Sequence, residues 1–160
     1  MTSPLPKPGF RQLYDNYPKG TNDFGAGGAI IDNPNYEHTC ALRMSVALTR
    51  CNKDIMNEFG GNVALDVSTS TRLPYARGAL ALARYLGGRY VGWVPAQLGS
   101  YRAVMRLRTQ GIIFWKTRGT VDHIDLLDGA THALPNGRHR SMLWIPQPHQ
   151  VIHALFWQLG

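Results

Sequence analysis

The sequence is poor in cysteine, and this scarcity excludes several kinds of site. Its 160 residues include only Cys40 and Cys51. If residues 40–51 form one helix, the two Cα atoms lie about 16 Å apart at about 1.5 Å per residue, whereas a disulfide needs Cα atoms within about 7 Å. The Cys and His spacings typical of zinc sites are also missing. We therefore expect no disulfide within the chain, no metal site and no cofactor.

Long apolar runs and acidic residues are scarce as well. No stretch of about 18 apolar residues occurs, so we expect no transmembrane span. The beginning, MTSPLPKPGF, has prolines and no apolar segment, so we expect no secretory signal peptide. Lys and Arg number 17 against 10 acidic residues, and the net charge of +7 favours an anionic partner. The basic residues are scattered and form no RNA-binding pattern, so no nucleic-acid partner is expected.

The length and the 44% hydrophobic content suit a single domain over residues 1–160. Patterning predicts helical segments at 10–18, 40–51, 75–88 and 95–111. Thr39 is the expected N-cap of the second helix and Asn52 its end, while Gly87 and Gly88 close the third. Polar residues at 53–73 and the glycine-rich stretch KGTNDFGAGGA at 19–29 predict loops.

Strand patterns follow in the second half of the chain. GIIFW at 111–115 is typical of a buried strand, and VDHIDLLDG at 121–129 alternates with period two before an Asp-Gly turn. SMLWIP at 141–146 is a third candidate, and residues 149–159 predict a short helix or a last strand. Helices followed by strands indicate an α+β fold with an antiparallel sheet.

One cysteine and one histidine could form a nucleophilic pair. Cys40 stands at a predicted helix start, where the macrodipole favours a thiolate. His123 lies on the period-two strand, and its ring would activate such a thiolate. The third group of such a site, which orients the imidazole, could be Asn136 or His132 from the following turn. Asp125, on the same strand face as His123, could also contact the ring, the substrate or solvent.

The motifs around these two residues resemble a known family. HTCALRMSVAL is similar to the nucleophile helix N-T-C-A-[IL]-R-[ML]-S-x-A-L of the fourth family of type VI secretion amidase effectors. GIIFW and DHIDLLDG resemble that family's GII-x-F and GH-[IV]-D-L-W-D-G strands, and VIHALFWQL resembles its closing V-x-LW-x-L. An early YP also fits. The matches keep the family's order and cover about a third of the chain.

This resemblance implies a papain-like cell-wall cysteine amidase, with the nucleophile helix packed on an antiparallel sheet. Cys40 would be the nucleophile and His123 the general base. The backbone N–H groups of Cys40 and Ala41 would stabilise the oxyanion. The substrate would be peptidoglycan, cut at an amide of the stem peptide, in this family the bond between D-glutamate and meso-diaminopimelate.

The same resemblance implies a route and partners. The toxin would be made in the donor cytoplasm without a signal peptide and delivered by the type VI secretion machinery to the periplasm of a target cell. A cognate immunity protein would block its cleft. The family's third catalytic residue is an aspartate on the strand after the histidine strand, but no acidic residue follows Asp128. That role therefore falls to another group, with Asn136 and His132 as candidates.

An alternative belongs to a different class of protein. The chain could be a basic binding module for an anionic polymer or nucleic acid, with Cys40 a buried structural residue, since free cysteines commonly pack as small hydrophobes. Salt-dependent polyanion binding that survives Cys40→Ala would indicate this alternative.

Overall fold

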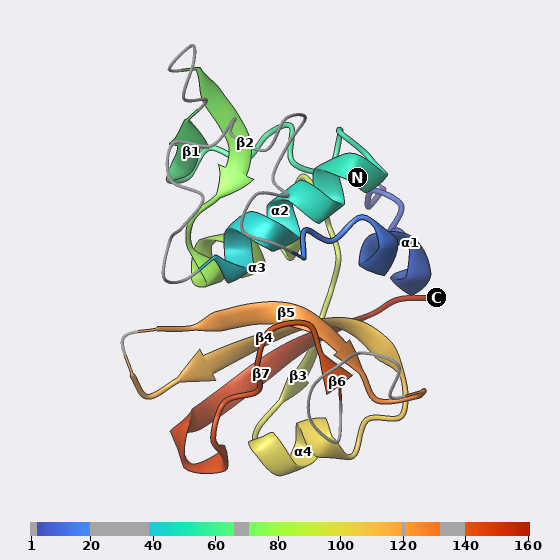
Figure 1. The fold of residues 1–160 in the computed structure, drawn as a ribbon, viewed down its shortest axis with the longest axis vertical. Coiled ribbons are helices and arrows are strands. Elements are labelled where there is room, and N and C mark those ends of the chain that lie inside the picture. Colours follow the sequence, from blue (N-terminus) through green and yellow to red (C-terminus); the bar gives the residue numbers. More distant parts are fainter. Residues whose placement is uncertain (1–2, 20–38, 66–70, 120, 132–139) are drawn as a thin grey trace.

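The computed structural model describes residues 3–19, 39–65, 71–119, 121–131 and 140–160. Figure 1 shows two layers, in which three helices and a small β-hairpin lie over one face of a five-stranded sheet, and a short helix lies on its other side. The predicted glycine-rich loop lies outside the described residues, apart from Lys19. Within the described ranges, no helix is long and apolar enough to cross a membrane.

The large sheet is antiparallel throughout, and its strands are not ordered as in the sequence. The spatial order is β3-β7-β4-β5-β6. The strands are β3 (Ala96–Leu98), β4 (Gln110–Thr117), β5 (His123–Asp128), β6 (Arg140–Ser141) and β7 (Val151–Gln158). The predicted α+β class is confirmed, as are the strands at 111–115 and in VDHIDLLDG. The last segment is a strand, not a helix, and it lies between β3 and β4.

Helix α2 (Cys40–Cys51) begins and ends where the sequence predicts. It is buried on two sides, because Ala41, Met44 and Leu48 pack toward the sheet while Leu42 and Val46 pack under the small hairpin. Thr39 is the N-cap residue, as predicted, although its side chain makes no capping hydrogen bond. Thr39 Oγ1 instead accepts a hydrogen bond from Arg43 Nε at 2.9 Å.

The hairpin of β1 (Val63–Leu65) and β2 (Arg72–Ala76) corrects two predictions. It lies partly in the predicted loop 53–73, and it takes the first residues of the predicted helix 75–88. The buried Ser45 hydroxyl of α2 accepts a hydrogen bond from the N–H of Ala76 at 2.9 Å, which keeps this segment extended. Helix α3 therefore starts only at Ala79 and ends at Leu86, before Gly87 as expected.

The predicted helix at 95–111 is also wrong for most of its length. Ser100 Oγ accepts a hydrogen bond from the N–H of Ala103, so the cap starts a short helix there, α4 (Tyr101–Met105). The residues before it pair with β7 as β3. Of the predicted strand 141–146, only Ser141 is a strand residue. Two further short elements are α1 (Phe10–Asp15) and the 3₁₀ helix η1 (Pro148–Gln150).

Both faces of the sheet are covered by side chains. Ile112, Phe114, Ile124 and Leu126 pack against α1, α2 and α3. The alternate residues of the same strands, Ile113, Trp115 and Leu127 among them, pack with Val104 of α4. All six residues of β5 are consequently buried, including His123 and Asp125. The sheet thus carries its polar site residues inside the molecule.

The backbone of β7 leaves no room for a side chain at position 111. A Cβ atom added to Gly111 would lie 2.1 Å from the carbonyl oxygen of Trp157. Gly111→Ala is expected to lower the free energy of unfolding by about 3 kcal/mol, measured by urea denaturation, because overpacking forces the strands apart. Gly99→Ala is the control, since nothing lies within 4 Å of its added Cβ. Equal stability of the two variants would contradict the tight β4–β7 pairing.

Candidate active site

Cys40 is the first residue of α2 and is 6% exposed. It lines a pocket of about 270 Å³ together with residues 77–81, at the start of α3, and with Val121 and Asp122, which directly precede β5. The side chain of Thr39, the N-cap, accepts no hydrogen bond from the first N–H groups of α2. The pocket therefore brings the cysteine at the helix start next to the chain segment that leads into His123.

His123 opens β5 and has no exposed surface. Its Nε2 lies 3.1 Å from Asp125 Oδ2. The ring stacks on Trp144, with centroids 3.8 Å apart and planes 14° apart, while Trp144 itself is 41% exposed. One side of the imidazole is thus held by a carboxylate, and one face is covered by an indole.

Asp125 is buried but well supplied with donors. Its Oδ1 accepts from the N–H of Leu126 at 2.8 Å, and its Oδ2 accepts from the N–H of Leu143 at 2.9 Å and from the Ser141 hydroxyl. Together with the contact to His123, these bonds compensate the loss of water around a buried carboxylate. The carboxylate is therefore fixed in the position from which it orients the imidazole.

The pKa of His123 is raised from 6.5 to about 9. Burial alone would lower it, but hydrogen bonding and charge from Asp125, and interaction with Cys40, raise it more. The other ring nitrogen, Nδ1, is buried and has no hydrogen-bond partner among the described residues. The imidazole is thus held through Nε2, and Nδ1 can still form a hydrogen bond with a further group.

The structure brings His123 and Asp125 into contact, and Asp125 is the residue for which the sequence left several roles open. Cys40 helps to raise the pKa of His123, whereas His132 and Asn136 lie outside the described residues. Asp125 occupies the place of an imidazole-orienting group. Asp122, the neighbour of His123 in the sequence, instead pairs with Lys116 Nζ at 3.1 Å and accepts from the N–H of Thr117.

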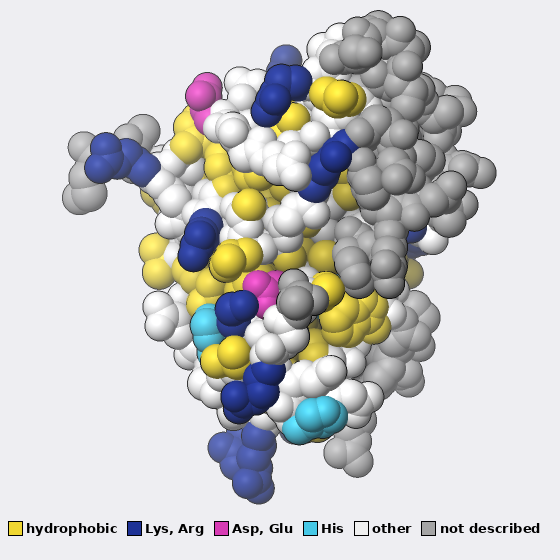
Figure 2. Space-filling model, turned by 90° about the vertical axis from the view of Figure 1, so that its left-hand side faces the viewer, with side chains coloured by type: hydrophobic (Ala, Val, Ile, Leu, Met, Phe, Trp, Pro, Cys, Tyr) yellow, Lys and Arg dark blue, Asp and Glu magenta, His cyan; other side chains and the backbone are white. Residues whose placement is uncertain are grey.

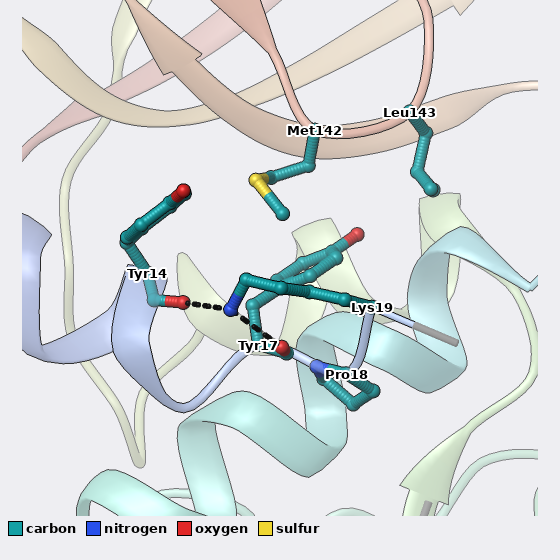
Figure 3. A pocket seen from close by; sticks show the side chains of 6 residues that line it. All are labelled: Tyr14, Tyr17, Pro18, Lys19, Met142 and Leu143. Carbon is teal, nitrogen blue, oxygen red and sulfur yellow. Dashed lines mark hydrogen bonds between the residues drawn. The ribbon is translucent and has the colours of Figure 1, made fainter. Parts of the chain in front are cut away.

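A second pocket, of about 200 Å³, adjoins the site on the side of Leu143, the residue whose N–H binds Asp125. Figure 3 shows how Tyr14, Tyr17 and Lys19, from the segment around α1, face Met142 and Leu143 across it. Within the described part of the chain, no group of three or more His, Cys, Asp or Glu side chains could hold a metal ion.

Solved structures of other proteins have a similar architecture. The type VI effector Tae4 of Enterobacter cloacae, in its complex with Tai4, superposes with a TM-score of 0.63 at 18% identity, covering 96% of this chain and 99% of that chain. Tae4 of Salmonella typhimurium, in complex with the immunity Tai4 from Enterobacter cloacae, superposes with a TM-score of 0.62 at 18% identity, covering 96% of this chain and 100% of that chain. The chain has the Tae4 fold.

Free Tae4 of Enterobacter cloacae agrees, with a TM-score of 0.60 at 20% identity and coverage of 99% of this chain and 100% of that chain. No protein-family model matches the chain, and no curated protein matches it. The Tae4 fold therefore extends over nearly the whole chain, although few of the residues are identical.

The raised pKa of His123 makes stability depend on pH. A histidine whose pKa is about 9 when folded and 6.5 when unfolded stabilises the fold fully below pH 6.5, and this contribution is lost as the pH rises through 9. We expect the free energy of unfolding to fall by on the order of 3 kcal/mol between pH 6.5 and pH 9.5.

Urea denaturation at a series of pH values measures this slope, and His123→Gln should remove it. Asp125→Asn takes away the carboxylate that raises the pKa, so NMR titration of His123 in that variant should give a lower midpoint. An unchanged slope in His123→Gln would show that His123 is not the titrating group.

Proposed function

We propose that this chain is an antibacterial toxin, a type VI effector that hydrolyses an amide bond in the stem peptides of peptidoglycan. The observation that carries the proposal is the buried pair of His123 Nε2 and Asp125 Oδ2, 3.1 Å apart, with a cysteine at the start of a buried helix that helps to raise the pKa of His123. This order of groups is the one that thiol hydrolases use. The Tae4 fold and the resemblance of the Cys40 and His123 motifs to the amidase effectors support the same reading.

In the proposed reaction, the arrangement acts as a papain-like cysteine amidase. The Cys40 thiolate attacks the carbonyl carbon, a C–S bond forms, and the carbonyl electrons move onto the oxygen. The N–H groups of Cys40 and Ala41 at the helix start stabilise that oxyanion. When the tetrahedral intermediate collapses, the C–N bond breaks and protonated His123 gives its proton to the departing amine.

Hydrolysis of the acyl-enzyme uses the same groups in reverse. Neutral His123 takes a proton from a water molecule, whose oxygen attacks the thioester carbon. The C–S bond then breaks, and the carboxylic acid and the thiolate are released. Asp125 keeps the ring oriented in both steps and stabilises the imidazolium. Trp144 covers the ring face and limits access of water to the contact between His123 and Asp125.

The substrate follows from the resemblance and from charge. The bond is that between D-glutamate and meso-diaminopimelate, which is the bond cut by the amidase family. The net charge of +7 suits an anionic wall polymer. Figure 2 shows Lys and Arg side chains spread over the face drawn there, with acidic side chains at few places, so the attraction is diffuse.

Delivery and protection belong to the same proposal. The two complexes with the Tae4 fold are effector–immunity complexes. By analogy, the chain is delivered to the periplasm of a target cell by the type VI machinery, and a cognate immunity protein binds over the Cys40 pocket. A papain-like single domain over residues 1–160 is part of this proposal.

Digestion of purified peptidoglycan tests the function directly. Wild-type protein is expected to release cut stem peptides, identified by chromatography and mass spectrometry, and Cys40→Ala should lower the rate by about 1000-fold or more. Cys51→Ala is the matched control, since the half-buried Cys51 lies at the other end of α2 and should be dispensable. Unchanged cleavage by Cys40→Ala would exclude the mechanism, and no cleavage by a folded wild type would exclude the function.

A further inference from the structure

The stack of Trp144 on His123 is closer than the other ring contacts in the described part of the chain. Its centroids lie 3.8 Å apart and its planes differ by 14°. Neutral aromatic rings prefer offset or edge-to-face arrangements with centroids about 4.5–7 Å apart, because their negative faces repel one another. The other aromatic pairs keep to this range, at 5.2 Å for Phe59 with Tyr85, 6.2 Å for Tyr85 with Tyr90 and 6.0 Å for Tyr101 with Trp115. The close stack therefore indicates an attraction that neutral rings lack.

A positive charge on the imidazole supplies this attraction. The face of an indole carries negative potential, and a cation within about 6 Å of its centroid is attracted to it, most strongly where water is excluded. His123 has no exposed surface, and Asp125 Oδ2 lies 3.1 Å from its Nε2, which favours the protonated ring. Among aromatic side chains, tryptophan binds cations best. The contact is therefore attractive whenever His123 is protonated.

The backbone around Trp144 is fixed by the same carboxylate that holds the imidazole. Leu143, directly before Trp144, donates its N–H to Asp125 Oδ2 at 2.9 Å. The Ser141 hydroxyl contacts the same oxygen and lies 3.1 Å from the carbonyl oxygen of Trp144. Trp144 is itself exposed, so burial of its side chain does not explain where it lies. Its place over the ring follows instead from these bonds to Asp125.

The ionisable groups near the ring come from its own strand and from the elements packed around it. Asp125 of β5 and Cys40 of α2 act on His123 directly. The other ionisable groups of the neighbouring elements are Asp122 before β5, Lys116 of β4, Tyr17 after α1 and Arg43 of α2. Asp122 and Lys116 form an ion pair at 3.1 Å. Trp144 carries no charge, so a substitution there leaves all of these charges in place.

We propose that Trp144 is a positioning residue, which stabilises the protonated form of His123 through a cation–π contact. In the proposed reaction, the imidazolium is needed beside the Cys40 thiolate before the attack and again as the proton donor to the departing amine. This role rests on the proposed function, whereas the contact itself does not. The indole thus favours the thiolate–imidazolium pair without bringing a further charge into the site.

Titration of His123 by NMR tests this without any wall substrate. In Trp144→Leu, which keeps an apolar cover but removes the aromatic face, the midpoint should fall by about one pH unit, and in Trp144→Phe, whose face is weaker, by less. Ile145→Val is the matched control, because Ile145 is the next residue but packs with the cluster that contains Val104, so the midpoint should stay unchanged. An unchanged midpoint in Trp144→Leu would overturn the proposal.

A second measurement does not depend on the folding of Trp144→Leu. Incorporation of 5-fluorotryptophan keeps the shape of the indole but withdraws electrons from its face, so the His123 midpoint should fall by roughly a few tenths of a pH unit. In Trp144→Phe the same labelling should leave the midpoint unchanged. A midpoint that ignores fluorination, or that falls equally in Trp144→Phe, would overturn the proposal. Peptidoglycan cleavage is a separate readout, so a protein that shows the tryptophan effect but cuts no wall would refute the function alone.

Discussion

The buried carboxylate of Asp125 is the interaction on which the site and one edge of the sheet depend. A charge in a dry interior is costly unless donors surround it. Here those donors come from its own strand, from Ser141 and from Leu143. The bonds therefore tie the segment after β6 to β5 at the same time as they orient His123. Removing the carboxylate would release both the ring and the segment that covers it.

The second constraint is the burial of α2 on two sides. Most surface helices have one solvated face, but residues 40–48 of α2 are all buried. The polar side chains on this helix therefore need partners, and each partner fixes another part of the chain. Ser45 fixes the end of β2, and Arg43 fixes Pro18 and Thr39. Satisfying the buried polar groups of α2 thus assembles the surroundings of Cys40.

Local patterns predicted those parts of the structure that local forces decide. The helix at 40–51, the apolar run at 111–115 and the alternating segment around His123 have clear local patterns and matched the prediction. Thr39 is the N-cap as predicted, but its Oγ1 accepts a hydrogen bond from Arg43, one turn later, and makes no capping bond. The hairpin β1–β2 was missed because its strands have only three and five residues and because its end is anchored by Ser45, 31 positions before Ala76.

The role of Asp125 was equally hard to read from the sequence. Asp125 lies two positions after His123 on the same strand face. The sequence therefore allowed a contact with the ring but did not distinguish it from a contact with substrate or solvent. What makes it a fixed partner of the ring is the set of donors at Ser141 and Leu143, 16 and 18 positions later. Such contacts have no periodic signature.

The position of β7 has a consequence for the order of assembly during synthesis. Although it follows β3, β4, β5 and β6 in the sequence, it lies between β3 and β4. Until it inserts, the strands on its two sides cannot join through hydrogen bonds, and the core on both faces of the sheet stays open. Domains commonly fold as units, and non-local pairing is slow. The nascent chain therefore holds Cys40 and His123 in an unfinished scaffold until β7 has emerged and inserted.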